Sequence, residues 1–288
     1  MLYEQTTINC RGQLLELTSP IVMGIINVTP DSFYADSRAP NVLSLLEQVE
    51  LQLTEGAAII DVGGMSTRPG AEMISEIVEM NRILPAIRAI SRAFPEAIIS
   101  VDTFRASIAR ACVEEGAHII NDVSGGCLDE QMFATVAELG VPYILMHMRG
   151  TPQTMSQLTD YEDIALDLLD YFIEKVGILR GLKVKDIILD TGFGFAKTPE
   201  QSFELLAKLS VFQILECPIL VGLSRKGMIW KTLGVEPKDS LNGTTAAHML
   251  ALQGGAKILR AHDVTAALEA IKIFEAYKKH TKHDCNNI

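Results

Sequence analysis

The sequence predicts an α/β protein: a (β/α)8 barrel, or TIM barrel, with a short β-hairpin at its N-terminus. The first observation behind this prediction is a series of eight short runs rich in Ile and Val. These runs are hydrophobic on both faces, which is typical of parallel strands covered on both sides. The second observation is the helical pattern between successive runs. Strict alternation of strand and helix favours a closed barrel first and a doubly wound open sheet second.

The expected elements follow one another without a repeat or a linker that would divide the chain. The expected strands cover residues 21–26, 57–62, 97–102, 117–122, 142–148, 186–190, 218–224 and 256–261. The named helical patterns cover residues 43–56, 105–116, 129–140, 161–181, 199–209, 242–255 and 264–279. The first three of these patterns end on glycine, a common helix stop.

The two ends of the chain carry signals of their own. Residues 1–20 contain two short strand-like segments around Arg11 and Gly12, which predict a hairpin that caps the bottom of the barrel. Residues 278–288 are polar and are expected to form a flexible tail. We interpret residues 1–288 as one barrel domain, since single α/β barrels commonly run to about 250 residues.

Composition limits the class of protein. Hydrophobic residues make up 48% of the chain, as in a globular protein with a large core. No apolar run approaches the roughly 20 residues that cross a bilayer, and the first ten residues lack the pattern of a secretory signal. Five cysteines without metal-type spacing indicate reduced thiols and a cytoplasmic location. A net charge of −11 argues against nucleic acid or an anionic membrane as a partner.

Every expected strand ends on a polar side chain, and in these barrels the active site lies at the carboxyl ends of the strands. One such residue would be interpreted as a helix cap, but eight on one rim favour a functional site. In strand order the residues are Asn27; Asp61; Asp102; Asn121 and Asp122; His147; Asp190; Ser224, Arg225 and Lys226; and Arg260, His262 and Asp263. Carboxylates come from earlier strands and basic groups from the last two, which predicts separate cation-binding and anion-binding halves.

Three loops on this rim are long or rich in glycine. Residues 27–41 and 63–76 combine Gly or Pro with Ser, Thr and Arg, and we expect both to act as lids. Residues 190–197 read "DTGFGFAK", with two glycines and two aromatic rings. Such a loop allows the backbone to approach a flat ligand, although turn chemistry alone would produce the same pattern.

These segments, taken in order, resemble the dihydropteroate synthase family. The resemblance covers about residues 14–277 and rests on "MGIINVTPDSF", "GAAIIDVGGMSTRPGA", "ISVDT", "GAHIINDVSG", "LMHMRGTPQTM", "DTGFGFAKT", "VGLSRKGMI" and "ILRAHDV". It implies a pterin-binding TIM barrel, usually a homodimer, that is the target of sulfonamides. The implied reaction belongs to folate biosynthesis. It joins 4-aminobenzoate to (7,8-dihydropterin-6-yl)methyl diphosphate with the help of Mg²⁺, giving 7,8-dihydropteroate and diphosphate.

The resemblance also implies roles for individual residues. The catalytic residues would be Lys226, Asp102 and Asp190. The pterin would be bound by Asp102, Asn121, Asp190 and Lys226, with Met146 and Phe195 as walls, although core packing explains these two walls equally well. 4-Aminobenzoate and the closing lids would use Thr67, Arg68, Pro69, Ser224, Lys226 and Phe33. The diphosphate would be held by Arg260, His262 and Asn27, and Asn27 would also be the protein ligand of Mg²⁺.

The chain departs from the family pattern at three places. Thr191 replaces the usual proline in "DTGFGF", and Met65 replaces the usual glutamate in "GGMSTRPG". In the first lid "DSFYADSR" replaces "DSFSDGG", so the lid aspartate is either absent or shifted to Asp36. None of the expected pocket positions is altered, so the departures concern the loops.

Two other functions remain as alternatives. One is a pterin barrel of the methyltetrahydrofolate:corrinoid methyltransferase type, which lacks the machinery for a diphosphate. Asn27, Lys226 and the pair of Arg260 and His262 argue against it. The other is a catalytically inactive pterin-binding relative, which the altered lids would permit. A methyl-transfer assay and a turnover assay, respectively, discriminate these from the synthase.

Overall fold

The computed structural model describes residues 5–28, 38–66 and 70–281 of the chain. Eight parallel strands form a closed barrel in the order β10-β3-β4-β5-β6-β7-β8-β9, which confirms the expected fold class. The barrel strands are β3 (Ile21–Asn27), β4 (Ile59–Gly63), β5 (Ile99–Asp102), β6 (Ile119–Asp122), β7 (Tyr143–Met146), β8 (Ile187–Asp190), β9 (Ile219–Val221) and β10 (Ala256–Ala261). Each overlaps one of the apolar runs in the sequence.

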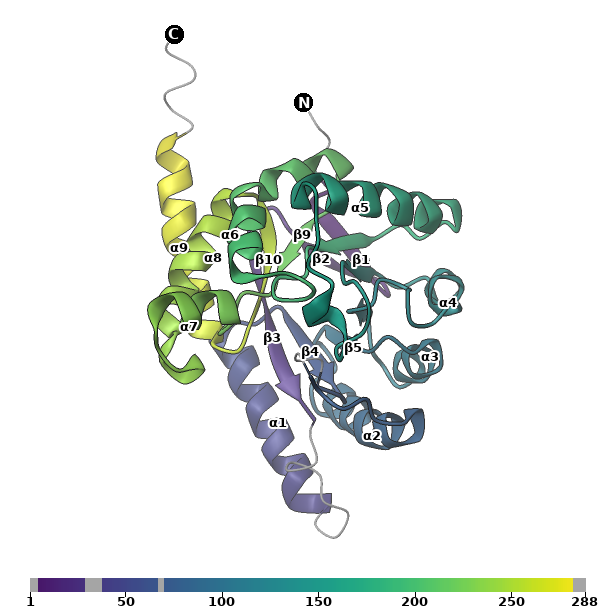
Figure 1. Cartoon of the computed structure of the whole chain (residues 1–288). Helices are drawn as coiled ribbons and strands as arrows, with labels where there is room; N and C mark the ends of the chain where they lie inside the picture. Colours follow the sequence, from purple (N-terminus) through teal and green to yellow (C-terminus); the bar gives the residue numbers. More distant parts are fainter. Residues whose placement is uncertain (1–4, 29–37, 67–69, 282–288) are drawn as a thin grey trace.

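Helices surround the strands (Figure 1). They are α1 (Arg38–Glu55), α2 (Glu76–Ala93), α3 (Ala106–Glu114), α4 (Met132–Leu139), α5 (Ile164–Gly181), α6 (Pro199–Ala207), α7 (Gly227–Leu233), α8 (Leu241–Gln253) and α9 (Val264–Thr281). The helices α2 and α7 lie outside the helical patterns named from the sequence. Helix α2 buries residues at helical spacing but carries Pro85 in its interior, and a proline inside a helical pattern predicts a break. Helix α7 has only seven residues, too few for a periodic signal.

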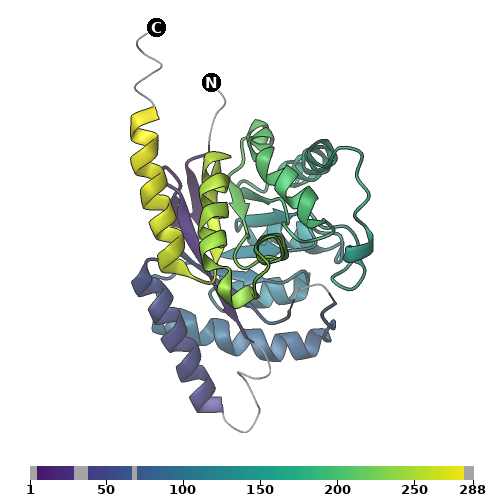
Figure 2. The same ribbon diagram turned by 60° about the vertical axis from the view of Figure 1, so that its left-hand side comes forward.

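The C-terminal helix is longer than the sequence indicates. Helix α9 continues to Thr281, past the expected start of the tail at residue 278. It lies beside α8, as both views show (Figures 1 and 2). Within the described ranges, no helix combines the length and the apolar character needed to cross a membrane.

The hairpin closes the amino end of the barrel. It is formed by β1 (Thr7–Cys10) and β2 (Gln13–Glu16), which pair antiparallel as expected. Side chains from the hairpin pack on a ring of apolar residues, one from each barrel strand or the position just before it. The hairpin residues are Ile8, Cys10, Leu15 and Leu17, and the ring is Met23, Ile59, Ile98, Ile119, Ile144, Ile188, Leu220 and Ile258. This end of the barrel is therefore a dry, filled core.

Side chains alternate along each strand, so the strand faces that form this ring also face the carboxyl end of the barrel interior. Residues two or four positions further along a strand face the same side. From the apolar ring, that spacing reaches Asn27, Asp61, Asp102, Asn121, Met146, Asp190 and Arg260. The intervening residues, such as Val62, Ile120 and Leu189, pack outward with the helices in the main core. The inward positions are thus apolar at the amino end and mostly polar at the carboxyl end.

Candidate active site at the carboxyl end of the barrel

Four inward-facing side chains from different strands form one hydrogen-bonded cluster. The Nε of Arg260 donates to Oδ2 of Asp61 at 2.7 Å, and its Nη2 donates to Oδ2 of Asp102 at 3.0 Å. The Nδ2 of Asn121 also donates to Oδ2 of Asp61, at 3.0 Å. All four come together because strands β4, β5, β6 and β10 end at the same rim.

The cluster retains acceptors that the protein does not use. Within the described part of the chain, Oδ1 of Asp61 and Oδ1 of Asp102 are buried and have no hydrogen-bond partner. Burial raises the pKa of Asp102 to about 7, and the positive charge of Arg260 opposes this rise. A buried polar atom without a partner costs free energy, so these oxygens fit a ligand that brings N–H donors.

Asp190 stands on the inner face of β8 and begins the glycine-rich loop. Its Oδ1 accepts a hydrogen bond from the backbone N–H of Gly192 at 2.8 Å. Burial raises the pKa of Asp190, while the charges of Lys226 and Arg260, among others, oppose the rise. Asp190 therefore belongs to the same electrostatic group as the four-residue cluster.

An apolar wall lies at the same end of the barrel. Met146 and Phe195 are buried, and both pack in a cluster with Phe104 and Val123. The Nζ of Lys226 lies 4.3 Å from the centre of the Phe195 ring, within the range of a cation–π contact. The predicted walls are thus core residues whose cluster reaches the site through the contact between Phe195 and Lys226.

The last two strands are joined at the rim by side-chain hydrogen bonds. The Oγ of Ser224 accepts from the backbone N–H of His262 at 3.3 Å and lies 3.0 Å from its Nδ1. Next to them, Arg225 forms two hydrogen bonds with Asp263, at 2.8 and 3.0 Å. Arg225 has a positive φ of 56°, which is uncommon for a residue other than glycine.

Two expectations about the strand-end residues are corrected by this geometry. The sequence predicts that the basic residues of the last two strands form an anion-binding half of the site, apart from the carboxylates. Arg260 instead forms ion pairs with Asp61 and Asp102. In addition, Asp122 does not join Asn121 inside the barrel. Successive residues face opposite sides of a strand, and Asp122 instead accepts hydrogen bonds from Tyr143, Ser124 and Gly126 outside it.

Asn27 is exposed at the end of β3, the position expected for a metal ligand. Among the described residues, no group of three or more His, Cys, Asp or Glu side chains could hold a metal ion. Mg²⁺ often keeps several waters and uses one or two protein oxygens together with substrate phosphates. A single amide oxygen at this rim fits that kind of binding.

The predicted lid contacts fall in parts of the chain that remain undescribed. Phe33, Asp36, Thr67, Arg68 and Pro69 lie outside the described residues. The described part of the second loop after these residues, 70–76, is held by hydrogen bonds at Gly70 and Ile74. Gly70 donates its backbone N–H to the carbonyl of Pro152 at 3.0 Å, and Arg105 donates to the carbonyl of Ile74 at 2.6 Å.

Arg105 also contacts the buried carboxylate of Glu79, which accepts a further hydrogen bond from Thr103 at 2.7 Å. Neither Glu79 nor Arg105 stands at a strand end, so the strand-end pattern does not predict a role for them. Asp61 does stand at a strand end, although the family resemblance implies no role for it. Its position two residues after Ile59, on the same strand face, is the signal that places it in the site.

Two of the three departures from the family pattern, Met65 and Thr191, lie in the described part of the chain, and both are buried. Met65 packs in the apolar cluster with Phe104 and Met146, so a carboxylate at this position is replaced by apolar surface. The hydroxyl of Thr191 is buried without a hydrogen-bond partner in the described structure. Asp190 keeps its hydrogen bond with Gly192 beside this threonine.

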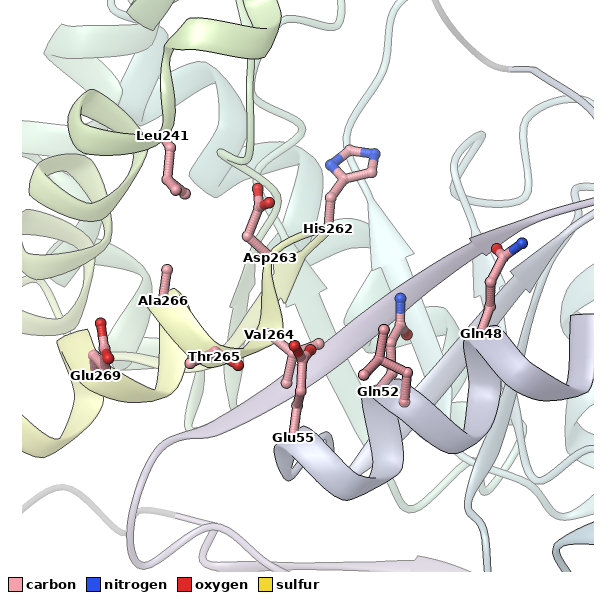
Figure 3. A pocket seen from close by; sticks show the side chains of 11 residues that line it. Gln48, Gln52, Glu55, Leu241, His262, Asp263, Val264, Thr265, Ala266 and Glu269 are labelled. Carbon is pink, nitrogen blue, oxygen red and sulfur yellow. The ribbon is translucent and has the colours of Figure 1, made fainter. Parts of the chain in front are cut away.

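A groove of about 400 Å³ lies on the flank of the barrel beside His262 (Figure 3). Gln48, Gln52 and Glu55 of α1 line one side of the groove. Ala266 and Glu269 of α9 line another part. Its lining contains none of the carboxylates of the cluster, so it adjoins the candidate site only through His262 and Asp263.

Comparisons with known proteins agree with the geometry. A family model described as "Pterin binding enzyme" matches residues 23–262. The chain is 41% identical to the dihydropteroate synthase of Escherichia coli (strain K12) over 268 residues, which cover 92% of this chain and 94% of the relative.

Solved structures show the same similarity in three dimensions. A dihydropteroate synthase of Yersinia pestis in a complex with a sulfonamide drug has a TM-score of 0.87 and 38% identity, and the match covers 95% of this chain and 99% of that one. A dihydropteroate synthase of Xanthomonas albilineans with 4-aminobenzoic acid has a TM-score of 0.87 and 36% identity, covering 95% and 98%.

Proposed function

This chain belongs to the dihydropteroate synthase family of pterin-binding enzymes, and from that membership we propose how its barrel rim carries out the reaction. The enzyme is a transferase of folate biosynthesis. It condenses (7,8-dihydropterin-6-yl)methyl diphosphate with 4-aminobenzoate to 7,8-dihydropteroate and diphosphate. The observation that carries the proposal is the buried cluster of Asp61, Asp102, Asn121 and Arg260, whose free acceptors face inward at the active end of the barrel.

The pterin binds to the carboxylates. Its edge presents adjacent N–H donors, and a carboxylate accepts two parallel hydrogen bonds from such an edge. Asp102 and Asp190 supply these acceptors and Asn121 supplies an amide. Met146 and Phe195 form walls for the flat ring, and Lys226 reaches its edge from above Phe195.

The diphosphate and 4-aminobenzoate bind at the opposite side of the rim. His262 and Asn27 are exposed there and hold the diphosphate. Arg260 joins them if its guanidinium shares its donors between the carboxylates and the diphosphate. When bound, Mg²⁺ supplies Lewis-acid stabilisation of charge on the diphosphate oxygens, and Asn27 is the residue that would hold it. Ser224 and Lys226 contact 4-aminobenzoate, and the family resemblance implies further contacts from Phe33, Thr67, Arg68 and Pro69, which lie outside the described residues.

The reaction follows a dissociative, SN1-like path. The bond between the methylene carbon and oxygen breaks, and the electron pair leaves with diphosphate. The carboxylates of Asp102 and Asp190 favour the positive charge that develops on the pterin. The aniline nitrogen then forms the new C–N bond and releases a proton. Exclusion of water from the site would prevent the cation from being trapped as an alcohol.

The decisive experiment mixes the purified protein with pterin diphosphate, 4-aminobenzoate and Mg²⁺ and follows diphosphate release in a coupled assay. We expect release that depends on both organic substrates and is inhibited by a sulfonamide. Binding of the pterin diphosphate without turnover would instead identify an inactive pterin-binding relative. Cobalamin-dependent methyl transfer would support the corrinoid methyltransferase alternative.

Replacing Asn27 with Ala tests the role proposed for this residue in metal binding. Because the amide oxygen would be lost, the Mg²⁺ concentration for half-maximal activity should rise about tenfold, within the range reported for loss of groups that support a metal site. An unchanged Mg²⁺ dependence would remove Asn27 from the metal site. Titrating Mg²⁺ into the complex with diphosphate by calorimetry gives a second readout that does not need turnover.

We further propose that the protein works as a homodimer in the cytoplasm. Exposed apolar side chains on α8 and α9, among them Leu250, Ile273 and Tyr277, support a second copy as partner. Free thiols at Cys10, Cys112, Cys127 and Cys217 support a reducing compartment. Sedimentation equilibrium tests the dimer: a particle of the 31.5 kDa of one chain would contradict it.

A further inference from the structure

Lys197 is a buried lysine at the end of the glycine-rich loop, and the proposed function assigns it no role. The residue is only 8% exposed. The Nζ lies 3.0 Å from Nδ1 of His147, 3.0 Å from the carbonyl oxygen of Phe195 and 3.1 Å from that of Gly192. A lysine ammonium has three N–H donors, and these three acceptors satisfy all of them.

The partners of Lys197 belong to the segments that build the pterin site. Gly192 donates its N–H to the carboxylate of Asp190, and the ring of Phe195 lies under Lys226. His147 follows β7, and its backbone N–H donates to the carbonyl of Asp190 at 3.0 Å. Lys197 therefore connects two segments. One is the loop backbone at Gly192 and Phe195, and the other is His147, at the end of the neighbouring strand β7.

The loop has an unfavourable backbone conformation at Ala196 and packs closely against its neighbour at Gly192. Gly192, Gly194 and Ala196 all have positive φ, of 67°, 77° and 49°. Glycine adopts this left-handed region readily, whereas a residue with a β-carbon does so at a cost, and Ala196 adopts it. A β-carbon on Gly192 would overlap the carbonyl oxygen of His147, so the loop packs directly against the end of β7.

The charge states of the pair agree with this hydrogen-bond pattern. Burial lowers the pKa of His147 well below its ordinary value, and the charge of Lys197 adds to the effect. A neutral histidine can present Nδ1 as an acceptor. Burial lowers the pKa of Lys197 to about 7, while the charge of Asp190 opposes that decrease. Three acceptors around Nζ favour the ammonium, because a neutral amine has one donor fewer.

We propose that Lys197 is a positioning residue, which holds residues 190–197 in the conformation that presents Asp190 and Phe195 to the pterin. The proposal rests on the proposed function, because it concerns the geometry of the same pterin site. Lys197 does not touch the substrate in this role. It acts through the loop backbone and through His147.

The test replaces Lys197 with Met, which keeps much of the side-chain length and removes all three donors. Calorimetry measures the Kd for 6-hydroxymethyl-7,8-dihydropterin, and steady-state kinetics measure KM for each substrate. We expect the Kd and the KM for pterin diphosphate to rise about 10- to 100-fold, because a misplacement of about 1 Å can cost that much. The KM for 4-aminobenzoate should change by less than about threefold, since the lost contacts lie on the pterin side of the site.

Lys257 provides the matched control. It is also 8% exposed, but it lies near the amino end of β10, away from the active rim. Lys257→Met should leave the Kd for the pterin unchanged, whatever its melting temperature. Pterin affinity within twofold of wild type in folded Lys197→Met, even with a lower Tm, would overturn the proposal and leave Lys197 with a role in stability alone.

If Lys197→Met does not fold, His147→Phe decides. Phe keeps an aromatic ring against Tyr171, whose ring centre is 4.9 Å away, and removes one of the three acceptors. We expect a pterin Kd about 3- to 10-fold higher, corresponding to the loss of one hydrogen bond, and an unchanged Kd would contradict the proposal. A wild-type protein that neither binds the pterin nor turns over would contradict the proposed function itself.

Discussion

At the scale of single residues, Arg260 organises the charges of the site. Its guanidinium bonds to Asp61 and Asp102, and Asn121 satisfies the same oxygen of Asp61. Removing one partner from a buried charge pair leaves an uncompensated charge, so these side chains act as a unit. The sequence located each of them at a strand end. It did not reveal that the arginine and the carboxylates share hydrogen bonds.

The raised pKa of Asp102 predicts a pH dependence of pterin binding. An ordinary aspartate stays ionised between pH 6 and 8, but Asp102 has a pKa raised to about 7 by burial. Below that pH it gains a proton and loses an acceptor for the N–H groups of the pterin. The Kd for the pterin, measured by calorimetry, should therefore rise about tenfold as the pH falls from 8 to 6.

Asp102→Asn is the control for this dependence, because an amide does not titrate. Its Kd should be weaker throughout and should vary less between pH 6 and 8. Since Asp102 interacts with Asp61 and Asp122, the observed midpoint belongs to the group of carboxylates. A Kd that is flat over this range in both the wild type and Asp102→Asn would show that Asp102 stays ionised in the folded protein.

Lys226 supports the second prediction at this scale. Lys226→Ala removes a cation that lies over Phe195 at the proposed pterin edge. We expect kcat/KM for 4-aminobenzoate consumption to fall at least about 100-fold, as when one preorganised donor is removed from an active site. Lys231 is an exposed lysine in the short helix α7, which begins directly after Lys226, and Lys231→Ala should leave kcat/KM within twofold. A wild-type rate for Lys226→Ala would remove its assignment.

At the scale of elements, the loop after β8 requires glycine at position 192 because the loop packs directly against the backbone of His147. Gly192 and Gly140 have nearly the same φ, 67° and 63°. A β-carbon on Gly140 would meet nothing within 4 Å, whereas one on Gly192 would overlap the carbonyl of His147. The sequence pattern "DTGFGFAK" indicated a turn with glycine, and only the packing separates these two glycines.

Replacing each glycine with Ala measures this difference. Gly140→Ala should lower the free energy of unfolding by about 1 kcal/mol, the backbone cost of the left-handed region. Gly192→Ala should cost about 2 kcal/mol more, because a tightly packed segment must also move. Urea unfolding monitored by circular dichroism gives both values. Equal costs would mean that the loop relaxes around the new methyl group without strain.

The whole molecule is organised by the inner face of the barrel. The hairpin and the apolar ring fill the amino end, and the same strand faces carry Asp61, Asp102, Asn121 and Asp190 at the other end. The hydrophobic plug and the candidate site thus lie at opposite ends of the barrel axis, as is usual in this fold. The hairpin should accordingly affect stability far more than pterin binding.

Ile8→Ala tests this separation. Ile8 is 1% exposed beneath the barrel, so its truncation should lower the free energy of unfolding by about 2–4 kcal/mol through lost burial and a cavity. Leu14→Ala on the same hairpin, where Leu14 is 69% exposed, should cost less than about 0.5 kcal/mol. Thermal and urea unfolding check both. A large loss of pterin affinity in folded Ile8→Ala would show that the two ends are coupled.

The sequence by itself determined the eight strands, the hairpin and the family, because buried parallel strands and their polar ends are local patterns that survive in one dimension. It also located the residues at the active rim. Only the tertiary structure decided which of these residues meet, because contacts across the barrel depend on strand order and on which face each side chain occupies. That is why Asn121 faces the site and Asp122 does not. Likewise, Arg260 lies among carboxylates, and Lys197 lies within hydrogen-bond distance of a histidine 50 residues away in the chain.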